Sequence, residues 1–247
     1  MLLSKKNSHK RDLLVKESNN YAVDHIYLIQ NKSHIELGYK SVTSFIKMFF
    51  EEFDADKIIN KYLNYWKKTN HPLYGDKSKE DIKQLWDLKR DVSAELGTYM
   101  HRQFELYYND EEYDTDIKEF IPFQNEIEKL VKQAYRTEWT VFMEEIKIVG
   151  NIDLVFINKD NEYCILDYKR MTTPGPNKYG QRCYIIDYSD DDITKHMLQL
   201  NIYKYILEAK YGIKIKHLFN MYVKNNDCHI VEREIIDVKK EILDRIT

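Results

Sequence analysis

The sequence predicts an α/β fold of the α+β kind, with a central mixed β-sheet flanked by helices and a helical N-terminal portion. The order of expected elements carries this prediction: after a short hairpin come several helices, then three strands, a helix, two strands and a helix. Composition agrees, because only 7 Gly and 4 Pro in 247 residues favour long regular elements. The 43% of hydrophobic residues are enough to fill a sizeable core.

The domain organisation expected from the sequence is simple. Residues 1–20 are polar and basic and predict a flexible arm, with a phosphate-contacting or nuclear-targeting segment as the alternative. Residues 21–247 are expected to form a single domain without an internal linker. Within it, residues 41–133 form the mainly helical portion, and residues 135–247 form the sheet core with C-terminal helices.

Capping residues mark where the first helices begin. A short hairpin over residues 25–40 is followed by Ser41 or Thr43, either of which suits the N-cap of a helix. Asp54 suits the N-cap of the helix over residues 55–68. The sequence therefore predicts two helices in quick succession.

Further along, Ser78 and Asp81 resemble a capping box for a long helix. Gly97 is expected to interrupt that helix, so that residues 97–109 continue as a separate segment. The remaining expected elements are an acidic loop at 109–116, a helix at 117–133, strands near 137–148, 150–157 and 162–169, an irregular loop at 171–190, a helix at 193–211, strands at 216–223 and 228–234, and a terminal helix capped by Asp237.

The most informative stretch is the expected β-hairpin over residues 144–170. Asp153 lies on its first arm, and the second arm ends in Asp167, Tyr168 and Lys169. Side chains alternate along a strand, so Asp167 and Lys169 point to one face and Tyr168 to the other. Acids and a lysine at the ends of apolar strands cost free energy unless they are paired, solvated or bound to a metal.

These residues suit phosphodiester hydrolysis assisted by Mg²⁺ or Mn²⁺. Such an ion accepts a few hard oxygen ligands, which Asp153, Asp167 and the carbonyl of Tyr168 can supply. Lys169 can orient or help to deprotonate the attacking water, or stabilise negative charge on the phosphorus centre. The alternative is a solvated ion pair at a sheet edge, since an Asp-x-Lys sequence alone is common.

Two further pairs lie at helical spacing. His101 and Glu105 share one helix face, where His101 can complete a metal shell and Glu105 can orient it or bind the metal. Gly97 precedes them and would permit close backbone approach. Gln199 and Tyr203 also share a face and can hold a phosphate, a base or the lysine. The alternative for His101 is a hydrogen-bonded structural histidine. The alternative for Gln199 and Tyr203 is ordinary helix packing.

Charge and cysteine content limit the possible partners. The net charge is −3 with a pI near 6.3, so contact with nucleic acid must depend on a local basic groove or on metal ions. The three cysteines, Cys164, Cys183 and Cys228, fit no zinc or iron–sulfur signature, and reduced thiols favour an intracellular protein. We find no secretory signal and no membrane-spanning run, and oligomeric state stays open.

Four motifs together resemble the PD-(D/E)XK nuclease superfamily, in its RecB-like branch. They are G-T-x-x-H-x-x-x-E at 97–105, G-x-x-D at 150–153, D-x-K at 167–169 and Q-L-x-x-Y-x-x-x-L at 199–207. The branch includes RecB-type and CRISPR-adaptation nucleases and the mitochondrial genome maintenance exonuclease. Residues 38–59 also resemble the segment that precedes these motifs in eukaryotic and large-DNA-virus relatives.

The resemblance implies a restriction-endonuclease-like core. It implies that Asp153, Asp167 and His101 contact Mg²⁺ or Mn²⁺, that Lys169 is catalytic, and that Gln199 with Tyr203 supports the site. The implied activity is that of a DNA exonuclease or a nuclease that processes flaps and single strands. The chain departs from some relatives because it lacks a four-cysteine set and has Asp at position 167.

Three other functions stay open. An RNA endonuclease uses similar chemistry, because cap-snatching enzymes combine a histidine, acids and a lysine. A non-catalytic nucleic-acid-binding module with the same fold is the alternative from another class, together with a structural interaction domain that would show no metal dependence. Retention of all the catalytic-type residues disfavours the non-catalytic module.

Overall fold

The computed structural model describes residues 2–16, 28–31, 34–36, 38–174 and 191–244. Contacts group the chain into two compact units, the first formed by Met1–Phe50 with Met100–Thr247 and the second by Glu51–Tyr99. A domain is a part of the chain that folds on its own, so the single domain expected for residues 21–247 stays a prediction. Residues 175–190 of the expected irregular loop, Cys183 among them, lie outside the described residues.

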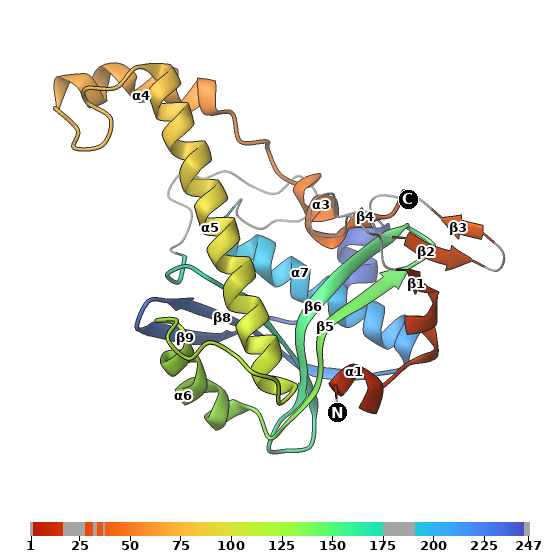
Figure 1. Cartoon of the computed structure of the whole chain (residues 1–247). Helices are drawn as coiled ribbons and strands as arrows, with labels where there is room; N and C mark the ends of the chain where they lie inside the picture. The colour runs from red at the N-terminus through yellow and green to blue at the C-terminus, as the bar shows by residue number, and fades with distance from the viewer. Residues whose placement is uncertain (1, 17–27, 32–33, 37, 175–190, 245–247) are drawn as a thin grey trace. The chain divides into compact units, whose positions relative to one another are not determined.

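The first unit holds most of the regular elements, which Figure 1 labels along the coloured chain. Its helices and helical turns are α1 (Leu3–Lys6), η1 (Lys10–Leu14), α3 (Val42–Lys47), the end of α5 (Lys79–Tyr108), α6 (Phe120–Leu130), α7 (Asp192–Ile206), η2 (Leu207–Tyr211) and η3 (Lys239–Leu243). Its strands are β1 (Val15–Lys16), β2 (Leu28–Asn31), β3 (His34–Glu36), β4 (Lys40–Ser41), β5 (Gln133–Met143), β6 (Ile148–Ile157), β7 (Tyr163–Lys169), β8 (Ile215–Lys224) and β9 (Asp227–Glu232).

Six strands form the main sheet, in the order β4-β6-β7-β8-β9, with β5 also paired to β6. The pairs β5–β6, β6–β7 and β8–β9 are antiparallel, whereas β4–β6 and β7–β8 are parallel. The sheet is therefore mixed, and helices flank it, which confirms the coarse fold class predicted from the sequence. A smaller antiparallel sheet of β1, β2 and β3 includes the expected N-terminal hairpin.

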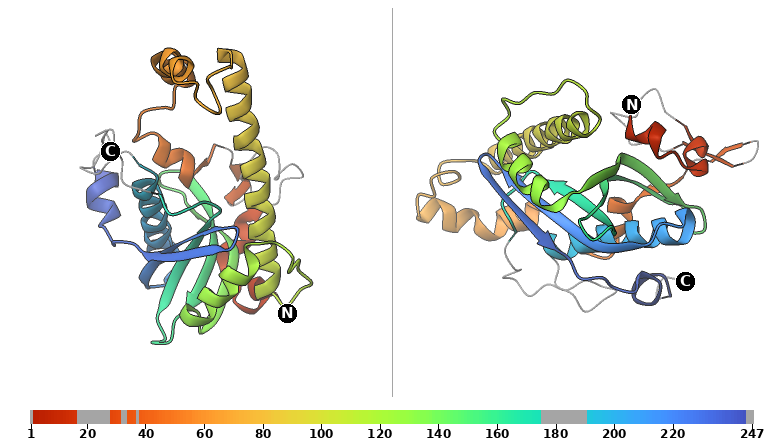
Figure 2. Two further views of the ribbon diagram at one scale, coloured as in Figure 1. Left: turned by 90° about the vertical axis from the view of Figure 1, so that its left-hand side faces the viewer. Right: turned by 90° about the horizontal axis from the view of Figure 1, so that it is seen from below.

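Helices lie against both faces of the main sheet (Figure 2). Two apolar clusters hold them there. On one face, α3 and α7 pack on β5 and β6 through buried side chains that include Phe45, Leu198, Ile202, Val141 and Ile152. On the other face, the end of α5 and α6 pack on β6, β7 and β8 through Phe104, Phe123, Leu166 and Met221. The rings of Phe104 and Phe123 stack with centroids 3.6 Å apart. Burial on both faces explains the apolar runs in β6 and β7.

The N-terminal residues 2–16 of the expected flexible arm contact β5. Asp12 binds Arg136 at 2.7 Å and accepts from the Trp139 indole at 2.9 Å. Arg11 lies over the ring of Phe142, 4.1 Å from its centroid. A mostly buried guanidinium needs a carboxylate partner, so the Asp12–Arg136 pair ties this segment to the sheet.

The second unit consists of α4 (Ala55–Lys68) and the first part of α5, joined by a turn. Ile59 and Ile82 are fully buried within it. Trp66 packs on Trp86 edge-on at 6.4 Å, and the Trp86 indole donates to the Tyr74 hydroxyl at 3.1 Å. Aromatic packing of this kind buries much of the apolar surface within the unit.

The expected capping residues of α3, α4 and α5 are those observed, whereas the N-cap of η3 is Val238 and not the expected Asp237. Ser41 caps α3, and the Asp54 side chain accepts from the backbone of Lys57 at 2.9 Å at the start of α4. Ser78 and Asp81 form the reciprocal bonds of a capping box at the start of α5. Local hydrogen bonding thus fixes these helix starts.

One expected interruption is wrong. Helix α5 runs unbroken through Gly97, and a Cβ at that position would meet nothing within 4 Å, so Gly97 permits no close approach of the backbone. One Gly inside a helix costs about 1 kcal/mol. Helix formation is cooperative, so the residues on both sides of Gly97 in this long helix outweigh that cost.

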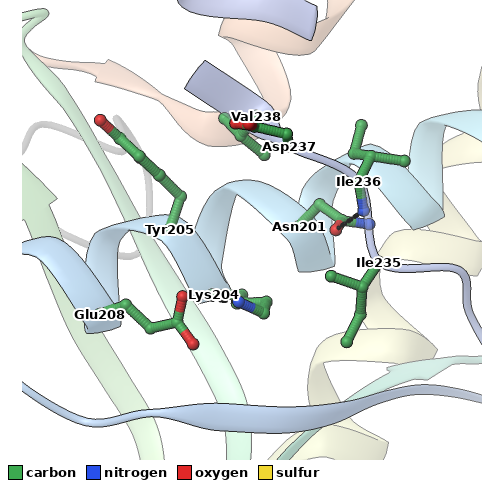
Figure 3. Close-up of a pocket in the computed structure, with 8 residues that line it drawn as sticks. All are labelled: Asn201, Lys204, Tyr205, Glu208, Ile235, Ile236, Asp237 and Val238. Carbon is green, nitrogen blue, oxygen red and sulfur yellow. Dashed lines mark hydrogen bonds and ion pairs between the residues drawn. The ribbon is translucent and has the colours of Figure 1, made fainter. Parts of the chain in front are cut away.

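The segment after β9 is held on α7 by Asn201. Its amide nitrogen donates to the Glu234 carbonyl at 2.8 Å. Its side-chain oxygen accepts from the Ile236 backbone N–H at 2.9 Å (Figure 3). A pocket of about 340 Å³ lies beside this contact and includes Lys204 and Glu208, which pair with each other at 2.6 Å. No helix in the described part of the chain is long and apolar enough to cross a bilayer.

Candidate active site

The predicted site residues converge where β6 and β7 separate. The pairing of these strands runs from Ile157 with Tyr163 to Leu154 with Leu166. Beyond it, the Asp153 carboxylate takes the place of a ladder carbonyl and accepts from the Tyr168 backbone N–H at 2.7 Å. The divergence therefore brings Asp153 to the end of β7, where Asp167 and Lys169 lie.

Asp167 and Lys169 point to the same face of β7, as strand alternation predicts. The Lys169 ammonium lies 2.7 Å from Oδ2 and 2.8 Å from Oδ1 of Asp167. The Asp167 side chain is almost fully buried, whereas Lys169 retains about a fifth of its exposure. Tyr168 points the other way, into the cluster beneath α5 and α6. The pair is therefore more than a solvated ion pair at a sheet edge.

Helix α7 supports the lysine through the expected glutamine and tyrosine. Lys169 donates to the Gln199 side-chain oxygen at 3.2 Å, and the Gln199 amide donates to the Tyr203 hydroxyl at 3.3 Å. Tyr203 in turn lies against Gly150 of β6, where an added Cβ would come within 2.7 Å of its ring. Gly150 thus permits the approach of α7 that positions Gln199.

A second group lies on the other side of Asp153. One ligand atom from each of His101, Glu138 and Asp153 lies within 4.8 Å of the other two. The Nδ1 atom of His101 is 3.5 Å from Asp153 Oδ1 and 3.7 Å from Glu138 Oε1. Its Nε2 donates to the carbonyl of Tyr168 at 3.1 Å, so His101 contacts both the acids and the expected carbonyl ligand.

Glu138 was not predicted from the sequence. It lies on β5 between Thr137 and Trp139, which pair with Leu154 and Ile152, so the register puts it opposite Asp153. Its φ is 42°, a left-handed conformation that costs free energy for a residue with a side chain. The one sequence feature that could have indicated Glu138 is that it is the single acid in β5, the strand that pairs with the Asp153 strand.

Two predicted residues lie outside this group of three. Asp167 is bound to Lys169 and to Asn220, whose amide donates to Oδ2 at 3.0 Å. Glu105 forms an ion pair with Arg102 at 2.5 Å instead of orienting His101. The structure therefore brings His101 and Asp153 together with Glu138, which was not predicted, and it places Glu105 outside this group.

Burial and neighbouring charges shift the pKa values of His101, Asp153 and Asp167. Burial alone would lower the pKa of His101, but the carboxylates of Asp153 and Glu138 outweigh it and raise the pKa to about 10. Burial would raise the pKa of Asp153, but the charge of His101 outweighs it and lowers the pKa. Burial raises the pKa of Asp167 to about 6, although Lys169 opposes the shift. Protonated His101 thus supplies the positive charge that the acids need.

The donor set suits a small divalent cation. Asp153, Glu138 and the Tyr168 carbonyl offer hard oxygen atoms, and His101 offers one imidazole nitrogen once its proton leaves. An imidazole among carboxylates suits Mn²⁺ better than Mg²⁺, which binds nitrogen reluctantly. The residues present therefore fit the metal expected from the sequence.

Comparisons with known proteins leave the family open. No protein-family model matches the chain, and no curated protein matches it. Among solved structures that match, one titled "Crystal structure of SSO0001" is 16% identical, with 87% of this chain and 78% of that chain covered and a TM-score of 0.38. A TM-score this low does not establish a shared fold or function.

Proposed function

We propose that this protein is a metal-dependent nuclease that hydrolyses phosphodiester bonds with Mg²⁺ or Mn²⁺. The observation that carries the proposal is the meeting of Asp153, Asp167 and Lys169 at the divergence of β6 and β7. His101 and Glu138 beside them support it, because they complete a set of metal donors. A bound cation would neutralise charge on the scissile phosphate and lower the pKa of a bound water.

The residues of the chain have separate tasks in this proposal. His101, Glu138 and Asp153 would hold the metal, with the Tyr168 carbonyl as a further donor. Lys169 would face the phosphate and the attacking water, because its ammonium group is held by Asp167 and Gln199 at the end of β7. Gln199 and Tyr203 are positioning residues, since they act through Lys169.

We also propose that the sheet is a restriction-endonuclease-like core and that the substrate is DNA with single-stranded segments or ends. The mixed strand order and the acids at the strand divergence support the first proposal. The motifs that resemble RecB-like nucleases favour an exonuclease or flap-processing activity, which is an argument by analogy. An RNA endonuclease and a non-catalytic binding module are the competing functions.

A cleavage assay on circular, linear and flapped DNA and on RNA separates these functions. We expect Mn²⁺-dependent cleavage of end-bearing or single-stranded DNA, and none in EDTA. Cleavage of RNA alone would replace DNA as the substrate, and binding without cleavage under any metal would favour the non-catalytic module.

A matched pair of variants ties the activity to the site. Asp167→Ala removes the buried acid, whereas Asp160→Ala makes the same change in the exposed turn between β6 and β7. We expect Asp167→Ala to abolish cleavage and Asp160→Ala to preserve it. Equal activity of the two variants would refute the proposed site.

A further inference from the structure

A second row of polar side chains lies beside the candidate site, on β8. The parallel pairing of β7 and β8 puts Asn220 next to Asp167 and Tyr222 next to Lys169. Asn220 is fully buried and donates to Asp167 Oδ2 at 3.0 Å. Tyr222 is 1% exposed, so its hydroxyl needs partners within the protein.

Arg233, just after β9, reaches back over this row. Its Nε donates to the Asn220 side-chain oxygen at 2.8 Å, and its Nη2 donates to the Tyr222 hydroxyl. In the described part of the chain, Arg233 has no carboxylate within ion-pair distance and its Nη1 has no hydrogen-bond partner. A half-buried guanidinium in this state is available for an anion.

His196 of α7 adds a second donor. Its Nδ1 lies 3.0 Å from the Tyr222 hydroxyl. Because Arg233 can only donate, the hydroxyl oxygen accepts from it and the hydroxyl proton is left for His196 Nδ1. Burial and the charges of Lys169 and Arg233 lower the pKa of His196 to about 3, so the ring is neutral and carries its proton on Nε2.

Charge divides the site into two parts. The acids Glu138 and Asp153 lie on β5 and β6, and His101 of α5 lies beside them. The donors lie around Tyr222 of β8: Lys169 of β7 is its strand neighbour, and Arg233 and His196 bond its hydroxyl. Neighbouring strands are about 4.8 Å apart, so Arg233 over β8 is offset from the phosphate that Lys169 would face.

We propose that Arg233 and His196 form an anion subsite that binds a phosphate of a single-stranded polynucleotide, next to the phosphate at Lys169. The inference rests on the proposed function, because it takes the substrate to be a polynucleotide. The subsite would hold the strand by its backbone without reading its bases. Asn220 links the subsite to Asp167, so a phosphate bound at Arg233 lies one side chain away from the site carboxylate.

The test measures binding of a fluorescein-labelled single strand of eight thymidines, by anisotropy, in EDTA and over a range of salt concentrations. Arg233→Gln should weaken binding about tenfold. It should also reduce the slope of log K against log salt by about 0.7, the value for one lost phosphate contact on a single strand. Lys216→Gln, the same charge loss at an exposed position on β8, should leave both values near those of the parent.

Arg233→Lys separates binding from positioning, because lysine keeps the charge but lacks the planar fork with which Arg233 bonds Asn220 through Nε and Tyr222 through Nη2. A slope preserved in Arg233→Lys supports the subsite. An unchanged slope in Arg233→Gln, or an equal fall in both Arg233 variants, would overturn it. EDTA prevents metal-dependent cleavage, so this result is independent of the cleavage assay, and either proposal can fail alone.

Discussion

The contact between Gly150 and Tyr203 gives the most specific test of how the site is built. A Cβ added at Gly150 would lie 2.7 Å from Tyr203 Cε1 and 2.8 Å from its hydroxyl oxygen. Tyr203 is 3% exposed, so its ring is enclosed by other side chains of the core. Gly150→Ala should therefore cost about 1–3 kcal/mol of unfolding free energy, the usual cost of overpacking.

The same substitution should reduce cleavage. A displaced Tyr203 releases the Gln199 amide, and Gln199 then no longer holds Lys169. Urea unfolding and single-turnover cleavage measure the two effects. In a Tyr203→Ala background the added methyl meets no ring, so Gly150→Ala should cost nothing further there, which gives a coupling energy of about 1–3 kcal/mol.

Gly97, a glycine inside a helix, serves as the control, and its substitution should change the unfolding free energy in the opposite direction. Gly97→Ala places a methyl where nothing lies within 4 Å and should stabilise the protein by about 0.5–1 kcal/mol. Equal costs of Gly150→Ala in the parent and in the Tyr203→Ala background would refute the proposed packing of α7.

Three further predictions concern the metal donors and pH. Glu138→Gln should weaken Mn²⁺ binding by at least tenfold in calorimetry, whereas Glu145→Gln, at an exposed position after β5, should not. Because the metal-free pKa of His101 is about 10, Mn²⁺ binding near pH 7 should release about one proton, and affinity should rise with pH; buffers of different ionisation enthalpy measure this. The folded pKa of His196 is about 3, below its unfolded value, so its contribution to stability is lost as pH falls from about 6.5 towards 3. His196→Gln should therefore make the unfolding free energy, measured with urea, less dependent on pH in that window. An unchanged pH dependence would contradict this prediction.

The sequence predicted the parts of the site that local periodicity determines. Strand alternation separated Asp167 and Lys169 from Tyr168, and helical spacing paired Gln199 with Tyr203. Capping chemistry located the start of α4 at Asp54 and of α5 at Ser78. These features depend on neighbours within a few residues.

Features that depend on distant contacts were not predicted. Glu138 joins the site only through its register with Asp153 and a left-handed backbone that strand patterns do not reveal. The role of Gly150 depends on a tyrosine on another element. Two other errors were local: the length of α5 carries the helix through Gly97, and Glu105 pairs with Arg102, its neighbour on the same helix, instead of His101.

The central claim is that Lys169 acts in metal-dependent phosphodiester hydrolysis. Its most direct test is single-turnover cleavage of single-stranded DNA with Mn²⁺ by Lys169→Ala and by Lys159→Ala, which makes the same change in the exposed turn of the same hairpin. We predict that Lys169→Ala loses at least about a hundredfold in rate while it still binds Mn²⁺, and that Lys159→Ala cleaves as the parent does. Cleavage by Lys169→Ala at the rate of the parent would contradict the account.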